Sequence, residues 1–347
     1  AEYGMFYPMG ARAMSGETEQ HLQLERELAD FVGKESAYLL NFGYQGMLST
    51  IDALVSRHDV IVYDSNSHAC IVDGVRLHMG KSFMFRHNDM DSFEKNIKRA
   101  TKVAEENGGG ILVITEGVFG MTGQQGKLKE IKKKKKQYSF RLLVDDAHGF
   151  GTLGKTGAGA GEEQGCQDQI DVYFSTFAKS MAGFGAFIAG NKEIIRYLKF
   201  NLRSQIFAKS LTMPMVIGGL KRLELLRTRP EIKAKLWENV EKLQNGLLER
   251  GFNLGNSNTC VTPVFMQGTP VEATLLVKDL RENFGIFTSV VVYPVIPKGI
   301  ILLRMIPTAS HTIEDINETL AAFEAIREKL TNGTYKALAE ANVENVE

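Results

Sequence analysis

The feature that most constrains the fold is an alternation of short apolar runs with helical stretches, which begins near residue 20. Residues 21–32 have the apolar spacing of an amphipathic helix. The predicted strands are rich in β-branched or aromatic residues and lie at Ser36–Leu40, Val60–Tyr63, Ile111–Thr115, Arg141–Val144 and Val172–Ser175. Because helical stretches separate most of these runs, we expect an α/β fold whose mostly parallel sheet is flanked by helices.

The sequence changes in character near residue 225, where Arg229-Pro230 interrupts the chain and a charged helix follows. Strand-like runs and helices alternate beyond it, at 261–266, 271–283, 287–293, 300–306 and 313–330. This pattern predicts a smaller C-terminal α+β domain. We therefore expect a large domain over residues 1–225, a small domain over 226–335 and a frayed helical tail over 336–347.

Composition excludes several classes of function. The chain of 347 residues has 41 Lys and Arg against 41 Asp and Glu, so its net charge does not indicate nucleic-acid binding. The three cysteines are widely spaced, and no Cys/His cluster predicts a metal. No apolar run approaches the roughly 20 residues that span a membrane, and no signal peptide opens the chain. We expect a cytoplasmic enzyme that lacks an N-terminal piece.

Polar or glycine-rich turns follow five of the predicted strands. In open parallel sheets, ligands bind beyond the carboxyl ends of the strands. The residues that fall there are Gly43, His68, Glu116, Asp145 with His148, and Thr176 with Lys179. Their shared position predicts one binding site at that edge of the sheet.

Lys179 follows a strand and precedes the small-residue run 181–185. Small neighbours allow desolvation, which lowers the pKa of a lysine and makes its amine nucleophilic. Taken alone, the segment favours the alternative of a surface lysine in a glycine-rich turn. Asp145 changes that balance, because a carboxylate that ends a buried strand needs a partner.

A protonated pyridine nitrogen is one such partner for Asp145, and His148 can reach the phenolic oxygen of the same ring. A metal pair or a helix-capping aspartate are the alternatives. Asp-x-x-His followed about 30 residues later by a strand-end lysine is the arrangement that pyridoxal 5'-phosphate needs, whereas metals usually need more ligands. His68 could stack on the ring, and the turn at 41–45 offers N–H groups to a phosphate. Either signal alone is weak.

Together these segments resemble the α-oxoamine synthases, which are pyridoxal-phosphate enzymes with the aspartate-aminotransferase fold. The resemblance covers about residues 10–330 and is most specific in His68-Ala-x-Ile-x-Asp-Gly74 and Asp145-Asp-Ala-His148-x-x-Gly151. Aminotransferases of this fold typically have Tyr in place of His148. The family condenses an amino acid with an acyl thioester and releases CO2.

The resemblance implies a role for each matching residue. Lys179 would be the Schiff-base lysine, Asp145 would hold the ring nitrogen, and His148 would hold the phenolic oxygen. With His68 stacked on the ring, these residues form the expected catalytic set. The remaining roles are phosphate binding by Gly43, Tyr44, Thr176 and, from the neighbouring subunit of a homodimer with shared active sites, Ser210, and binding of the substrate carboxylate by Arg304.

The chain also departs from the family. Glu116-Gly-Val-Phe-Gly120 replaces the usual Asp-Gly-x-Phe-Ser, so a ring-contacting serine is absent. Ala178 replaces a Ser or Thr that is common before the lysine, and the family's N-terminal Asn-x-Tyr-Leu-Gly segment is missing.

Segments 201–204 and 308–312 resemble the bacterial serine palmitoyltransferase-like branch. Segment 10–16 differs from the known branches, which makes Arg12 and Ser15 candidates for contact with the substrate side chain. We therefore expect serine or an analogue such as cysteate to react with a long-chain acyl thioester, giving a sphingoid-base or sulfonolipid precursor. The alternatives are glycine C-acetyltransferase (2-amino-3-ketobutyrate ligase), 8-amino-7-oxononanoate synthase and a non-catalytic subunit of a heterodimer, although the last usually lacks the lysine.

The run Lys132–Lys136 raises the question of a further interaction, with an acidic partner. It continues a predicted helix, and a solvated helix face is the simpler interpretation. Five adjacent lysines would nevertheless attract an acidic acyl carrier protein or the anionic headgroups of the inner membrane. We retain peripheral contact through this run as an expectation.

Overall fold

The computed structural model describes residues 10–293, 296 and 298–344, and the chain divides into two compact units. The first unit runs to Phe119 and from Gln125 to Pro230, and the second joins Gly120–Gln124 to the chain from Glu231. The short 120–124 segment belongs to the second unit because it bonds there: the Thr259 hydroxyl donates to the Gly123 carbonyl at 2.9 Å. No local pattern of apolar residues marks such a contact.

The described part of the first unit contains a seven-stranded sheet with the order β1-β7-β6-β5-β4-β2-β3. Its strands are β1 (Ser36–Leu40), β2 (Val60–Asp64), β3 (Lys81–Phe85), β4 (Ile111–Glu116), β5 (Arg141–Asp145), β6 (Val172–Thr176) and β7 (Ala186–Gly190). The predicted α/β class with a mostly parallel sheet is confirmed. Strands β3 and β7 were not predicted; β3 is the outermost strand opposite β1, and most of its side chains lack the burial that produces an apolar run.

The direction of the strands determines which turns meet. Strand β7 is antiparallel to both of its neighbours, β1 and β6, whereas β2 to β6 pair in parallel. Two reversals restore the direction, so β1 points the same way as β6 and ends at the same edge. The turn after β1 therefore reaches β6: a Cβ built on Gly43 would lie 3.2 Å from Thr176 Oγ1.

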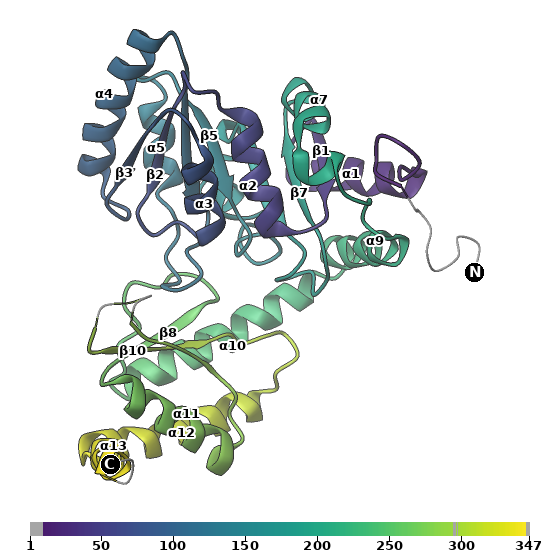
Figure 1. Cartoon of the computed structure of the whole chain (residues 1–347). Helices are drawn as coiled ribbons and strands as arrows, with labels where there is room; N and C mark the ends of the chain where they lie inside the picture. Colours follow the sequence, from purple (N-terminus) through teal and green to yellow (C-terminus); the bar gives the residue numbers. More distant parts are fainter. Residues whose placement is uncertain (1–9, 294–295, 297, 345–347) are drawn as a thin grey trace. The chain divides into compact units, whose positions relative to one another are not determined.

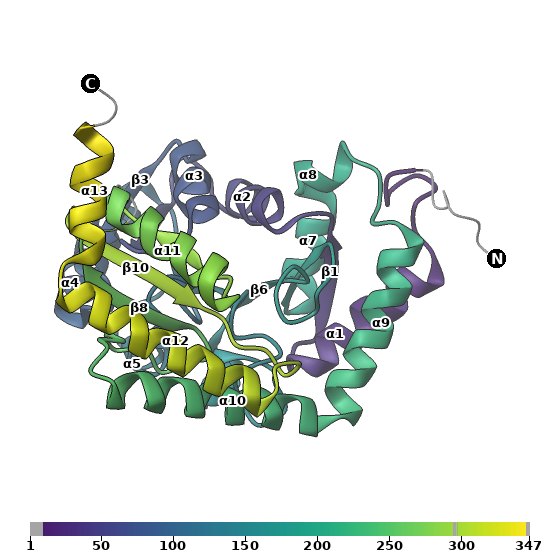
Figure 2. The same cartoon turned by 90° about the horizontal axis from the view of Figure 1, so that it is seen from below.

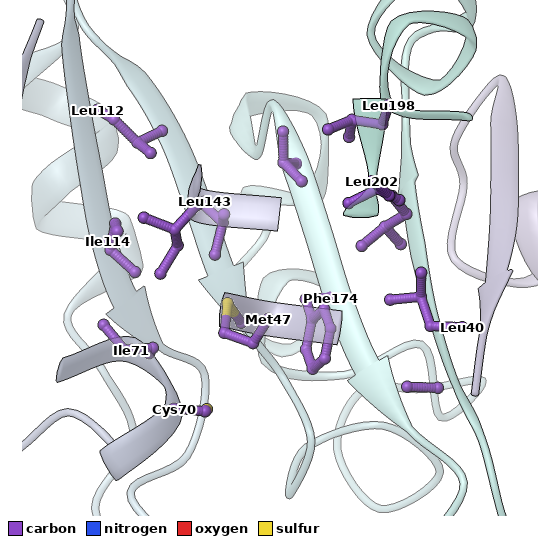
Figure 3. Close-up of a cluster of buried hydrophobic side chains, with 14 of the residues drawn as sticks. Leu40, Met47, Cys70, Ile71, Leu112, Ile114, Leu143, Phe174, Leu198 and Leu202 are labelled. Carbon is purple, nitrogen blue, oxygen red and sulfur yellow. The ribbon is translucent and has the colours of Figure 1, made fainter. Parts of the chain in front are cut away.

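Helices cover this sheet. Those of the first unit are α1 (Glu19–Phe31), α2 (Gly43–Leu54), α3 (Ala69–Leu77), α4 (Met90–Asn107), α5 (Leu128–Lys134), α6 (Ala160–Glu163), α7 (Lys192–Asn201), α8 (Arg203–Ile206) and α9 (Met213–Thr228). Helices α2 and α3 lie next to each other (Figure 1), and α1 packs beside α9 (Figure 2). Figure 3 shows the core under α2, α3 and α7, with Leu112, Leu143, Phe174, Met47, Ile71 and Leu198.

The second unit is the predicted smaller α+β structure. Its described strands form an antiparallel sheet in the order β8 (Thr262–Gln267), β10 (Ile300–Met305), β9 (Ser289–Val291). Its helices are α10 (Pro230–Glu249), α11 (Pro270–Phe284), α12 (Ile313–Thr331) and α13 (Thr334–Glu344). Capping boxes start α11 at Thr269 and α12 at Thr312, where a side chain three residues later returns the hydrogen bond.

We expected a frayed tail over residues 336–347, but the described part of this segment belongs to the helix α13. Helix α13 packs against α11 and α12. Tyr335 is 3% exposed, and its hydroxyl donates to Asp279 at 2.5 Å. One aromatic side chain therefore anchors a segment whose own sequence is too polar and short of apolar periodicity to predict docking.

Three of the five lysines in the run Lys132–Lys136 form ion pairs within the first unit, which the sequence did not show. Helix α5 ends at Lys134, so the run does not wrap one helix. Lys132 pairs with Asp168 at 3.4 Å, Lys134 pairs with Glu94, and Lys135 pairs with Asp171. Acidic groups that are distant in sequence thus neutralise part of the charge. None of the helices in the described residues is long and apolar enough to cross a membrane.

Tyr335→Ala tests the docking of α13. Loss of a buried aromatic side chain should cost the second unit about 3 kcal/mol or more. The measurement is denaturant unfolding followed by the fluorescence of Trp237, the single tryptophan of the chain, which lies in α10. Substitution of the exposed neighbour, Lys336→Ala, should leave the transition where it is. An equal effect of both substitutions would contradict the docking of α13.

Candidate active site

A cavity of about 200 Å³ lies at the carboxyl edge of the sheet of the first unit. The side chains and turns that line it come from the ends of β1, β2, β4, β5 and β6, as the strand-end pattern predicted. Its lining comprises Gly43, Tyr44, His68, Cys70, Glu116, Asp145, Ala147, His148, Phe174, Thr176, Ala178 and Lys179. No role was predicted for Cys70 or Phe174. Both are buried residues of apolar character, and such residues are usually part of the hydrophobic core.

Asp145 is the last residue of β5 and is 5% exposed. One oxygen accepts the Ala147 N–H at 3.1 Å, and the other lies 4.0 Å from the Cys70 thiol. Burial raises the pKa of Asp145 to about 6, although the Ala147 N–H and Lys179 oppose the rise. A buried carboxylate with such weak partners fits a protonated ring nitrogen, which would supply the missing positive charge.

Lys179 lies in the turn after β6 and opens onto the same cavity. Its predicted desolvation is wrong for the single chain, because the side chain is exposed. The small residues around it, such as Ala178 and Ala182, are too short to cover it. Ala182 has a φ of 42°, a left-handed conformation that is strained for a residue with a Cβ.

The start of α2 suits an anion. Its N-cap residue, Phe42, has no side-chain acceptor to offer the first N–H groups of the helix. Gly43 leaves the space beside Thr176 that a Cβ would fill. These features fit the phosphate of the cofactor. The Thr176 hydroxyl already donates to the Gly185 carbonyl at 3.0 Å, and the Tyr44 hydroxyl donates to Asp73.

His68 and Glu116 are joined at the rim of the cavity. The Glu116 carboxyl accepts the backbone N–H of His68, with 2.5 Å between Oε1 and N. Burial and then Lys179 lower the pKa of His68. His148 also lines the cavity, and the Thr152 hydroxyl donates to its backbone carbonyl at 2.9 Å.

The structure does not bring Arg12, Ser15 or Ser210 into the cavity. Arg12 is buried and pairs with Glu25 at 2.7 Å and Glu17 at 2.9 Å, and its contact with the substrate side chain stays a prediction. Its charge is already satisfied by its own chain, a contact that the sequence did not show. Ser15 is exposed, and the Ser210 hydroxyl donates to the Gly10 carbonyl at 3.2 Å.

Arg304 belongs to β10 of the second unit. Its Nη1 donates to the Gly120 carbonyl at 3.3 Å, and its buried Nε has no hydrogen-bond partner among the described residues. A guanidinium held by one carbonyl keeps donors available for a carboxylate. The described residues include no group of three or more His, Cys, Asp and Glu side chains that could hold a metal ion.

Comparisons with known proteins place this site in a family. The model of the family described as aminotransferase class I and II matches residues 6–323. A cysteate-C-fatty acyltransferase from Capnocytophaga ochracea is 69% identical over 338 residues, which are 97% of this chain and 80% of that protein. A serine palmitoyltransferase from Sphingobacterium spiritivorum is 36% identical over 311 residues, 90% of this chain and 76% of that protein.

Solved structures agree. A serine palmitoyltransferase from Sphingomonas wittichii has a TM-score of 0.88 and 30% identity, covering 94% of this chain and 80% of that one. A high-resolution structure of SPT with its PLP has a TM-score of 0.87 and 30% identity, covering 93% and 80%. This chain therefore belongs to the class I and II aminotransferase family and, within it, to the α-oxoamine synthases.

The raised pKa of Asp145 predicts a pH-dependent effect of Asp145→Asn on stability. The unfolded carboxyl titrates near its ordinary pKa of about 3.9, so the folded chain binds more protons between that pH and about 6. Stability is then lost as the pH rises through this window and stays lower above it. The neutral amide escapes this loss.

We expect the cofactor-free Asp145→Asn variant to melt at a higher temperature than the cofactor-free parent above pH 6, and the difference to shrink toward about pH 4. Thermal melts across this pH range provide the measurement. Asp52→Asn, at an exposed aspartate, serves as the control substitution. A variant that is less stable at high pH would show that Asp145 is not penalised by its burial.

Proposed function

We propose that the chain is a pyridoxal-phosphate-dependent acyltransferase that condenses cysteate with a long-chain acyl thioester and releases CO2 and the free thiol, giving a sulfonolipid precursor. The observation that carries the choice of cysteate is the 69% identity, over 97% of the chain, to a protein described as a cysteate-C-fatty acyltransferase. Serine is the second candidate, because serine palmitoyltransferases are also relatives over nine-tenths of the chain.

Pyridoxal phosphate, when bound, supplies an electron sink that stabilises negative charge on the Cα of the substrate. Lys179 would hold it, Asp145 would pair with its ring nitrogen, and His148 would meet its phenolic oxygen. The N–H groups of Gly43 and Tyr44 at the start of α2, with Thr176, would hold its phosphate. Their common position around one cavity supports these roles.

The residues of the chain supply the rest of the chemistry. Lys179 Nζ would act as the general base that takes the proton from the substrate Cα. Arg304 would hold the substrate carboxylate through paired N–H donors and so direct the Cα–H bond. His68 would cover the face of the ring and donate to the bound substrate.

A homodimer is part of this proposal. Ser210 lies outside the cavity of its own chain and would reach the phosphate held by the partner. For docking of a carrier protein or an anionic membrane, Lys133 and Lys136 are the exposed members of the lysine run, whereas Lys132, Lys134 and Lys135 are engaged with acidic groups of the first unit.

Lys179→Ala should abolish turnover, because the chain then has neither the covalent attachment of the cofactor nor the base at Cα. The measurement is acyl transfer from a long-chain acyl thioester to cysteate, together with trapping of the cofactor on the chain by borohydride. Lys155→Ala, at another exposed lysine of the first unit, is the control and should be trapped normally. Trapping in Lys179→Ala would mean that another lysine carries the cofactor.

Substrate choice can be tested without the acyl donor. A site built for a polar side chain rejects analogues that lack the group far more strongly than an apolar pocket rejects a missing methylene. Cysteate should therefore change the visible absorbance of the bound cofactor at a concentration at least about tenfold lower than glycine or alanine. Tighter titration by serine would favour the serine palmitoyltransferase alternative, and tighter titration by glycine would exclude both.

A further inference from the structure

Helix α3 begins beside the cavity, and its first N–H groups need acceptors from outside the helix. Its N-cap residue is His68, whose Nδ1 accepts the Cys70 N–H at 3.2 Å. In a capping box, the side chain at the third helical position accepts the N–H of the N-cap residue in return. That position in α3 is Ile71, which is apolar and buried, so the helix itself cannot complete the box.

Glu116 completes it from another part of the chain. The residue ends β4, 48 positions away from His68, and its Oε1 accepts the His68 N–H at 2.5 Å. Glu116 is 5% exposed, so the acceptor side of this part-buried hydrogen bond is shielded from water. The contact ties the backbone of His68, and with it the first turn of α3, to the edge of the sheet.

The capping geometry also determines where the ring of His68 carries its proton. A backbone N–H can only donate, so the Nδ1 that accepts from Cys70 must offer a lone pair. The neutral ring then carries its proton on Nε2. Burial, with Lys179 as the second cause, lowers the pKa of His68 and favours this neutral form.

The charge of Glu116 follows from its surroundings. It faces Asp145 across the paired register of β4 and β5, and both carboxyls are buried. Burial first and Asp145 second raise the pKa of Glu116 well above its ordinary range; Asp64 adds to the rise, and the His68 N–H and Lys179 oppose it. Two buried carboxylates this close do not both ionise readily, and Asp145 is the one that a ring cation would favour as an anion.

We propose that Glu116 is a positioning residue for His68, that it accepts the His68 N–H as a protonated and uncharged carboxyl, and that it thereby holds the imidazole as an Nε2–H donor at the active site. The consequence for turnover rests on the proposed function, whereas the contact and the charge of Glu116 do not. The uncharged carboxyl also leaves Asp145 as the sole anion of the pair.

The test compares Glu116→Gln with Glu116→Ala in the holoenzyme. Glutamine keeps a carbonyl acceptor of the same length but cannot ionise, whereas alanine removes the acceptor. Hydrogen exchange of the backbone amide of His68, followed by mass spectrometry, should accelerate about tenfold or more in Glu116→Ala and stay within about threefold in Glu116→Gln. Asp146→Asn alters another buried carboxyl, which accepts the Ala160 N–H at 2.8 Å, and should leave the exchange of His68 unchanged.

Infrared spectroscopy tests the charge directly. The spectrum of the parent minus that of Glu116→Gln should contain the band of a protonated carboxyl at neutral pH. Its absence would show that Glu116 is ionised and would overturn the uncharged form. Unchanged His68 exchange in Glu116→Ala would overturn the contact.

Kinetics then separate positioning from simple stability. The value of kcat/KM for cysteate should fall about tenfold or more in Glu116→Ala and be rescued to within about threefold in Glu116→Gln. Equal losses in both variants, with normal exchange in Glu116→Gln, would mean that the site needs a charged Glu116 and would overturn the proposal. If the parent itself does not turn over cysteate, the proposed function fails, and the exchange and infrared results still decide the role of Glu116.

Discussion

The candidate site depends on carboxyl groups that the sheet holds away from water at one edge. Asp145 and Glu116 are register partners on β5 and β4, and each is 5% exposed. Burial of an ionisable group costs stability unless a partner compensates, and such costs concentrate at functional sites. The weak partners of Asp145 leave room for a cation, and the N–H of His68 stabilises Glu116. The rest of the site is arranged around these two groups.

The strand order makes that arrangement possible. Strand β7 enters between β1 and β6 in the opposite direction, which leaves β1 aligned with the parallel strands. The turn that starts α2 therefore comes next to Thr176, and the proposed phosphate site and Lys179 line the same cavity. The antiparallel strand β7 does not separate the residues of the site, because its two neighbours, β1 and β6, still run in the same direction.

The sequence predicted the class of fold and much of the cavity lining for one physical reason. A buried strand is a short apolar run, and the polar residue that follows it marks the edge of the sheet, so Asp145, Thr176 and Lys179 could be placed from the sequence alone. The same reasoning failed for the exposure of Lys179, and the sequence did not show that Arg12 pairs with Glu25 on α1. Pairing and solvent access depend on residues that local patterns do not include.

The sequence by itself determined the order and type of the main elements, the residues at the strand ends and the likeness to a pyridoxal-phosphate family. Only the tertiary structure decided that Glu116 caps α3 from 48 residues away, that Tyr335 docks the last helix, and that part of the lysine run is neutralised. The reason is that periodicity and turn chemistry act over a few residues. Hydrogen bonds and pKa values instead depend on distances in space and on burial. Folding sets both by bringing together residues that are far apart in the chain.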